Sequence, residues 1–98
     1  MRFSTNSTST VLDRKKAKGK YPEARIIVLD DNFNTFEHVA NVLATIIPGI
    51  SKKRSWNLAI KVDKEGSAEV WRGPLEQAEL YHEQLTRNGL TMAPIEKT

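Results

Sequence analysis

The stretch RIIVLDDNFNTFEHVANVLATIIPG, residues 25–49, decides the fold. Its first five residues form a short run rich in β-branched side chains, which predicts a buried strand, and a polar turn follows at Asp30. From Phe36 onward apolar residues recur at helical spacing until a Pro-Gly pair stops the pattern, with Asn34 or Thr35 as the expected N-cap. A strand, a polar turn and an amphipathic helix therefore open the fold.

The rest of the pattern predicts four further elements. In chain order these are a helix capped by Ser51, an alternating strand over 68–72, a helix between Gly73-Pro74 and Asn88-Gly89, and a strand over 90–95. Pro94 cannot donate to a sheet ladder, so the last strand is expected at an edge or with a bulge. The order β-α-α-β-α-β predicts an α+β fold, a small two-layer sandwich of a three-stranded antiparallel sheet and three helices.

Length and composition exclude several classes of protein. With 98 residues, 39% hydrophobic and 28% charged, the chain matches one soluble domain, and not a collagen-like, membrane-spanning or wholly disordered chain. The absence of cysteine excludes disulfides, thiolate metal sites and a cysteine nucleophile. No apolar run approaches the ~18 residues of a membrane span, and the polar N-terminus lacks the core of a signal peptide, so we expect a cytoplasmic protein.

Charge divides the chain into two parts. Residues 1–20 carry six basic residues against one acid, whereas the other 78 carry nine basic and eleven acidic residues, although the whole chain has a net charge of +3. The N-terminal part is also rich in Ser and Thr and poor in apolar residues. We therefore expect a disordered basic extension over 1–22 and one folded domain over 23–98.

Little in the sequence supports catalysis. Gly19-Lys20 lacks the rest of a phosphate-binding loop, and His38 and His82 fall on separate helices at positions typical of a polar surface. We expect no catalytic residue, no metal and no cofactor. A nucleic-acid-binding module that uses the basic extension is a weak alternative, because the folded part is net acidic and has no aromatic strand motif for base stacking.

The polar cluster Asp30-Asp31-Asn32 is the most informative candidate site. Three acceptor side chains that leave a buried strand together attract a cation, whether a metal, a basic side chain or a protonated amine. The same residues are favoured in ordinary turns and helix caps, so the triplet alone leaves both interpretations open. The glycine and distal glutamate of a calcium loop are missing.

Three segments of the sequence resemble the ClpS adaptor family. They are IVLDDNFNTFEHV at 27–39, GSAEVW at 66–71 and RNGLTMAPIE at 87–96, and the resemblance extends from about residue 23 to the end. It implies an adaptor of a Clp AAA+ protease, not an enzyme. Such adaptors bind proteins with a hydrophobic N-terminal residue, the N-degron of the N-end rule, and deliver them to the N-terminal domain of a ClpA- or ClpC-type unfoldase for degradation. A monomer without membrane or nucleic-acid partners is expected.

The resemblance also assigns site residues by position. It assigns α-amine binding to Asp30, Asp31, Asn32 and Lys61, and the side-chain pocket to Leu29, Asn34, Phe36, Val39, Asn57, Ile60 and Met92. Several of these depart from the family pattern: the amine-binding run Asn-Asp-Asp of the family reads Asp30-Asp31-Asn32 here, and Met92 stands where the family has a leucine. Lys61 replaces a histidine and must turn outward or pair with Asp30, while Phe36 and Asn57 replace adaptable methionines.

These departures predict a smaller pocket that prefers N-terminal Leu over Phe, Tyr and Trp. An alternative is a modulator that occupies the unfoldase without binding N-degrons, docking through the region Pro74 to Gln77. In this family the N-terminal extension takes part in substrate transfer, so its deletion should spare binding and impair degradation.

Overall fold

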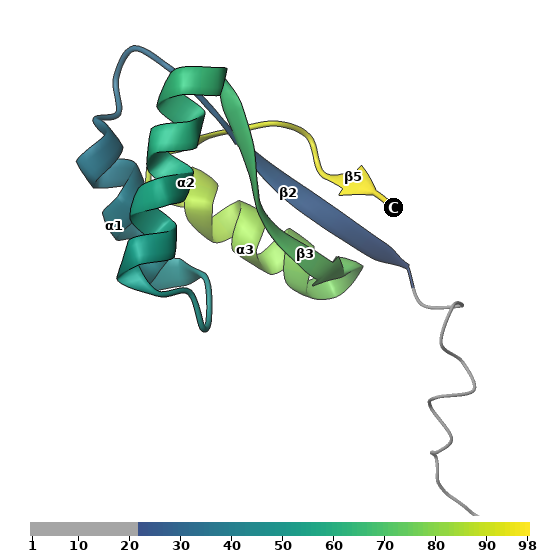
Figure 1. Ribbon diagram of the computed structural model, residues 1–98. Coiled ribbons are helices and arrows are strands. Elements are labelled where there is room, and N and C mark those ends of the chain that lie inside the picture. Colours follow the sequence, from purple (N-terminus) through teal and green to yellow (C-terminus); the bar gives the residue numbers. More distant parts are fainter. Residues whose placement is uncertain (1–21) are drawn as a thin grey trace, which may run out of the picture.

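Strand β2 (Glu23–Leu29) is the centre of an antiparallel sheet, with strand order β3-β2-β4 and β5 paired with β2 as well (Figure 1). The structure, a computed structural model, describes residues 22–98. Along β2, Ala24, Ile26 and Val28 are fully buried while the residues between them remain partly exposed. The predicted buried strand is confirmed, and one of its two faces lies against the helices.

Strand β3 (Ser67–Pro74) pairs antiparallel with β2 and contains a bulge. Ile27 pairs with Glu69 and Ile26 pairs with Trp71, so one extra residue lies on β3 between these pairs. The bulge turns Trp71 to the same face as buried Ile26. There its ring packs edge-to-face on Tyr81 of the third helix, with centroids 5.0 Å apart.

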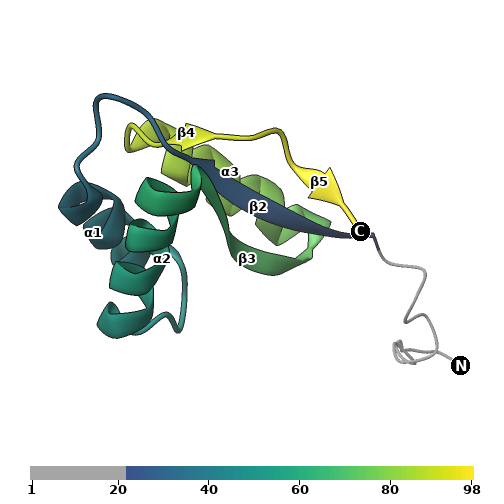
Figure 2. The ribbon, with the colours of Figure 1, turned by 45° about the horizontal axis from the view of Figure 1, so that its top comes forward.

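The C-terminal strand predicted over 90–95 is interrupted. Two short strands, β4 (Thr91–Met92) and β5 (Glu96–Lys97), pair with β2 at different points along its length (Figure 2). Pro94 lies between them, as the missing N–H of proline requires. The third sheet position therefore holds two strands, which makes four strands in the described chain instead of the predicted three.

Three helices complete the fold, and their N-caps include the predicted residues. Helix α1 (Phe36–Ile46) begins after Thr35, whose hydroxyl accepts from the backbone N–H of His38 at 3.1 Å. Helix α2 (Lys52–Glu65) begins after Ser51, whose hydroxyl accepts from the N–H of Arg54 at 3.0 Å. Helix α3 (Leu75–Arg87) begins directly after β3 and ends before Asn88.

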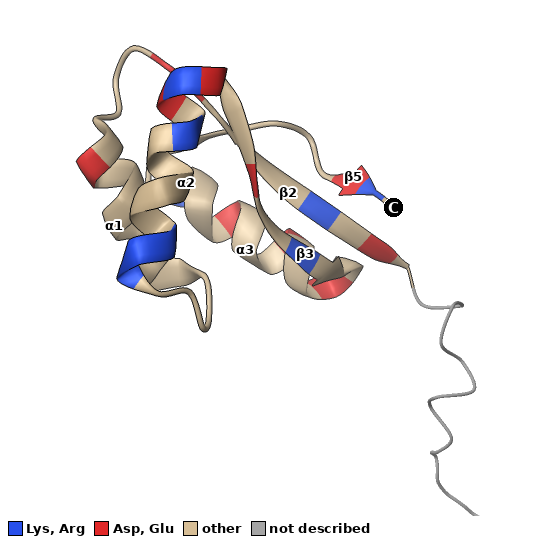
Figure 3. Cartoon of the chain, in the orientation of Figure 1, with Lys and Arg blue, Asp and Glu red and all other residues tan. Residues whose placement is uncertain are grey.

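Helix α2 opens with three consecutive cations, visible as blue bands at its first turn in Figure 3. No acid lies in that turn, so the charges oppose the positive end of the helix dipole. The cap of Ser51 and the buried residues Leu58, Ala59 and Val62 stabilise the helix despite this arrangement.

The core lies between the sheet and the helices. Helix α3 crosses behind β2 and β3, and α1 and α2 form a hairpin beside it, with α2 next to β3 (Figure 2). None of the helices in residues 22–98 is long and apolar enough to cross a membrane. The extension predicted over 1–22 lies outside the described residues, apart from Pro22.

Candidate functional site

Asp31 organises the loop between β2 and α1. Its Oδ1 accepts from the backbone N–H groups of Phe33 at 2.8 Å and Asn34 at 2.7 Å, and its Oδ2 accepts from Asn34 Nδ2 and Thr91 Oγ1, both at 2.7 Å. The backbone N–H of Asn34, then the Thr91 hydroxyl, hold the pKa of the Asp31 carboxyl well below its ordinary value of 3.8. A carboxylate has about four acceptor positions, so three donors from the loop and one from Thr91 of β4 occupy all of them.

The same loop is fastened to the turn after α3. Asn34 Nδ2 donates to the carbonyl of Gly89 at 2.9 Å, and His38 Nε2 lies 3.0 Å from the carbonyl of Asn88. A carbonyl only accepts, so His38 carries its proton on Nε2 in this bond. His82 makes the equivalent contact to the carbonyl of Ala93 at 2.9 Å and is half-buried, so the polar-surface position predicted for it holds only in part.

The other predicted amine-binding residues are accessible to solvent. Asp30, Asn32 and Lys61 are exposed, and their side chains make no hydrogen bond or ion pair with any residue in 22–98. The backbone N–H of Asp30 donates to the carbonyl of Gly66 at 2.9 Å, which holds the loop beside the C-terminal end of α2. Of the two arrangements predicted for Lys61, an ion pair with Asp30 is absent from the described chain.

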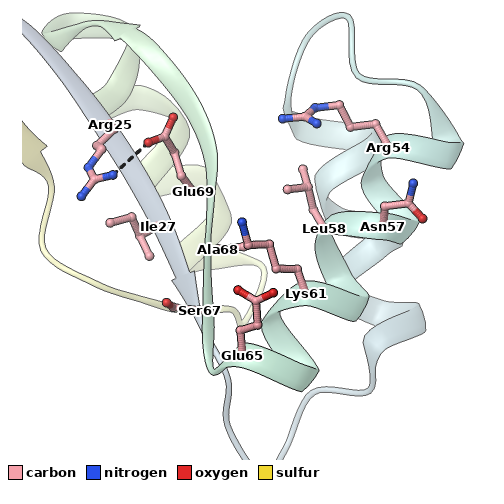
Figure 4. Close-up of a pocket in the computed structure, with 10 residues that line it drawn as sticks. All are labelled: Arg25, Ile27, Arg54, Asn57, Leu58, Lys61, Glu65, Ser67, Ala68 and Glu69. Carbon is pink, nitrogen blue, oxygen red and sulfur yellow. Dashed lines mark hydrogen bonds and ion pairs between the residues drawn. The ribbon is translucent and has the colours of Figure 1, made fainter.

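Lys61 instead lines a groove of about 660 Å³ between α2 and the outer face of the sheet (Figure 4). In Figure 4 its side chain extends from α2 toward β3, close to Glu65. The opposite wall carries Arg25, whose Nη1 lies 3.0 Å from Glu69 Oε1. The groove is lined by Arg25, Ile27, Arg54, Asn57, Leu58, Lys61, Glu65, Ser67, Ala68 and Glu69.

The predicted pocket residues differ in their exposure. Val39 is buried, Asn57 is exposed, and the others, Leu29, Asn34, Phe36, Ile60 and Met92, are half-buried. Asn57 is the only one of the seven that lines the groove. Phe36 packs against Trp56 of α2, with ring centroids 4.9 Å apart and planes at 80°. The resemblance did not point to Trp56.

Sequence reasoning missed the residues that hold the loop in place. Thr91, His38 and Asn88 lie 50 to 60 residues from their partners, so no local pattern links them. Asn88 was identified, but only as part of a helix stop. Within residues 22–98 no three His, Asp or Glu side chains are grouped so as to hold a metal ion.

Comparison with known proteins identifies the family. Residues 19–93 match the family described as ATP-dependent Clp protease adaptor protein ClpS. The chain belongs to the ClpS family. It is an adaptor protein and not an enzyme, and it acts with a Clp protease.

Several ClpS proteins are similar over most of the chain. The ATP-dependent Clp protease adapter protein ClpS of Synechocystis sp. is 50% identical over 95 residues, which cover 95% of this chain and 97% of that protein. The ClpS of Thermosynechococcus vestitus is 59% identical over 76 residues, covering 78% of this chain and 81% of the relative.

A solved ClpS structure confirms the α+β fold. Agrobacterium tumefaciens ClpS2 bound to L-phenylalaninamide superposes with a TM-score of 0.68, covering 79% of this chain and 98% of that one. The two sequences are 20% identical, so the likeness concerns the fold alone.

Proposed function

We propose that this ClpS chain binds proteins by a free, hydrophobic N-terminal residue and delivers them to the N-terminal domain of a ClpA- or ClpC-type unfoldase. The observation that carries the proposal is the pair of exposed acceptors, Asp30 and Asn32, on a loop that Asp31 holds in one conformation. L-phenylalaninamide, the ligand of the Agrobacterium protein, combines a free α-amine with a bulky apolar side chain. A chain terminus presents the same two groups.

The α-amine has two acceptors available in this arrangement. The Asp30 carboxylate and the Asn32 amide oxygen accept from the ammonium, while Asp31 holds the loop and does not touch the ligand. Of the amine-binding residues assigned by resemblance, Asp31 is therefore left out of the direct contacts with the ligand. Lys61, on the neighbouring helix, is a cation that weakens the attraction for an ammonium.

The side-chain pocket is proposed between α1 and α2. Phe36, Val39, Ile60 and Met92 supply apolar surface near the loop, and Leu29, Asn34 and Asn57 are the remaining members of the set. Because Phe36 is stiffer than methionine and Asn57 is polar, the pocket accepts N-terminal Leu in preference to Phe, Tyr and Trp.

Fluorescence anisotropy tests the proposal with a labelled peptide that starts in Leu and its N-acetylated form. Saturable binding that acetylation abolishes is the expected result, since acetylation removes the charge that Asp30 and Asn32 recognise. Asp30→Ala and Asn32→Ala should each weaken binding by about 10-fold or more. Asp63→Ala removes an exposed carboxylate from α2, outside the proposed site. It is the matched control and should leave the affinity for the peptide unchanged.

Delivery requires a separate assay with an unfoldase and its peptidase. Wild-type protein should accelerate degradation of a reporter that starts in Leu. A chain without residues 1–20 should bind the same peptide equally well and degrade the reporter more slowly. Equal degradation by both chains would refute a role of the extension in transfer.

The saturated carboxylate of Asp31 and the charge of Lys61 favour a second candidate. In it, the chain occupies the unfoldase and excludes other adaptors without binding an N-terminal residue. The same assays distinguish the two functions. The second candidate predicts that no peptide binds in the anisotropy assay and that the chain inhibits degradation promoted by another adaptor.

A further inference from the structure

Phe36 and Trp56 form the aromatic contact between α1 and α2 in the described chain. Their ring centroids lie 4.9 Å apart and their planes meet at 80°, which is the edge-to-face geometry that aromatic pairs favour. Phe36 is the first residue of α1 and packs against the core. The pair therefore joins the beginning of α1 to the second turn of α2.

Trp56 is fixed on one side and open on the other. It leaves 42% of its surface exposed, and in residues 22–98 the other exposed large hydrophobic residues are Phe33 and Leu80. Phe33 forms no aromatic pair in the described chain, and Leu80 is aliphatic. A ring held by Phe36 and partly open to solvent has the arrangement of a wall that can receive an apolar group.

Trp56 lies at the position of the proposed side-chain pocket. Trp56 lies four residues before Ile60, so the two share one face of α2, and Asn57 is its direct neighbour. Phe36 and Val39 lie on one face of α1 in the same way. Trp56 thus contacts Phe36 and shares a helix face with Ile60, two residues of the pocket, although the resemblance did not include it.

We propose that Trp56 is a further specificity-determining residue, whose indole contacts the first side chain of the bound protein. This inference rests on the proposed function. Phe36 and Trp56 support each other, so neither ring moves freely as a methionine would. Together they limit the pocket to a side chain of about the size of Leu and disfavour a flat aromatic ring.

The intrinsic fluorescence of Trp56 gives a direct test. The sequence has two tryptophans, so Trp71→Phe leaves Trp56 as the only one. Titration of this variant with a short peptide that starts in Leu and lacks Trp and Tyr should change the emission of Trp56 saturably, and the N-acetylated peptide should not. Emission that stays constant while anisotropy shows saturation would overturn the inference.

Peptide selectivity gives a second readout. In Trp56→Ala, the ratio of the affinities for peptides that start in Leu and in Phe should fall about 2- to 10-fold, and Trp56→Phe should keep part of the preference. Leu80→Ala, which removes a similarly exposed apolar side chain from α3, should leave the ratio unchanged. An unchanged ratio in Trp56→Ala would contradict the role of the indole.

The two proposals fail in different ways. If the wild-type protein binds neither the Leu nor the Phe peptide, terminal recognition itself is absent and both proposals fall. If it binds the Leu peptide by its free amine, but Trp56 neither reports binding nor alters selectivity, only the role of Trp56 falls.

Discussion

The hydroxyl of Thr91 donates to Asp31 Oδ2 at 2.7 Å and joins strand β4 to a loop 60 residues earlier in the chain. This bond completes the set of four that saturates the Asp31 carboxylate. It makes the shape of the proposed amine site depend on the docking of the C-terminal segment. Loop and segment should therefore stabilise each other.

Mutation of this pair should reveal that coupling. Thr91→Val is expected to destabilise the fold by about 0.5–1.5 kcal/mol and Asp31→Asn by about 1–3 kcal/mol, because the asparagine amide would face N–H donors. Urea unfolding measures both. The double variant should lose less than the sum of the single losses, since the second change removes a bond that is already broken. Full additivity would contradict the coupling.

Acid should weaken the fold through Asp31. The hydrogen bonds from the Asn34 backbone and from Thr91 lower the pKa of Asp31 in the folded state, so the unfolded state binds the proton more tightly. The resulting stabilisation is complete above about pH 4, the pKa of an ordinary Asp, and is lost as the pH falls below it. Urea unfolding at about pH 6 and about pH 3 should show a smaller difference for Asp31→Asn than for wild type.

Gly73 should not tolerate a side chain. A Cβ at this position would lie 2.5 Å from Cη2 and 2.7 Å from Cζ2 of the Trp71 indole. Gly73→Ala is expected to destabilise the fold by about 1–3 kcal/mol, measured by thermal or urea unfolding. Introducing Gly73→Ala into a Trp71→Phe background should cost less, because the phenyl ring lacks these two atoms. An equal cost in both backgrounds would mean that the indole is not the obstacle.

Arg25 should hold the C-terminal strand β5 on the sheet. Its guanidinium bonds Glu96 through Nε at 2.8 Å and Glu69 through Nη1 at 3.0 Å, and so bridges β5 and β3 across β2. In Arg25→Met, amide exchange at Thr98, whose N–H donates to the Glu23 carbonyl, should accelerate about 2- to 5-fold. Arg72→Met removes a partner of Glu69 alone and should leave Thr98 unchanged.

Removal of the Lys61 charge should improve ligand binding. If the ammonium of Lys61 repels an incoming α-amine, Lys61→Met should tighten binding of a peptide that starts in Leu by about 2- to 5-fold at low salt. The gain should shrink at high salt, and the acetylated peptide should remain unbound. Lys64→Met removes another exposed cation of α2 and serves as the control. Weaker binding of the Lys61→Met variant would show that the lysine supports the ligand instead.

Local patterns were sufficient for most of the fold. The apolar run of β2 and the helical spacing after Phe36 identified their elements, and Thr35 and Ser51 cap the helices as predicted. These signals involve neighbours within a few residues, so the sequence contains them directly. The division of the C-terminal segment into two strands was predicted only in part. Pro94 indicated an irregularity, but the pairing of Glu96 with Arg25 required the whole sheet.

The sequence by itself determined the family, the order of the elements and the presence of three acceptor residues after the first strand. Only the tertiary structure distinguished those acceptors: Asp30 and Asn32 remain exposed, whereas Asp31 is occupied in holding the loop. Three of the four donors to Asp31 are local, but the fourth, Thr91, comes from the far end of the chain. Likewise, only packing brought Trp56 against Phe36. Contacts between residues distant in sequence depend on how helices and strands meet, and no local pattern contains that information.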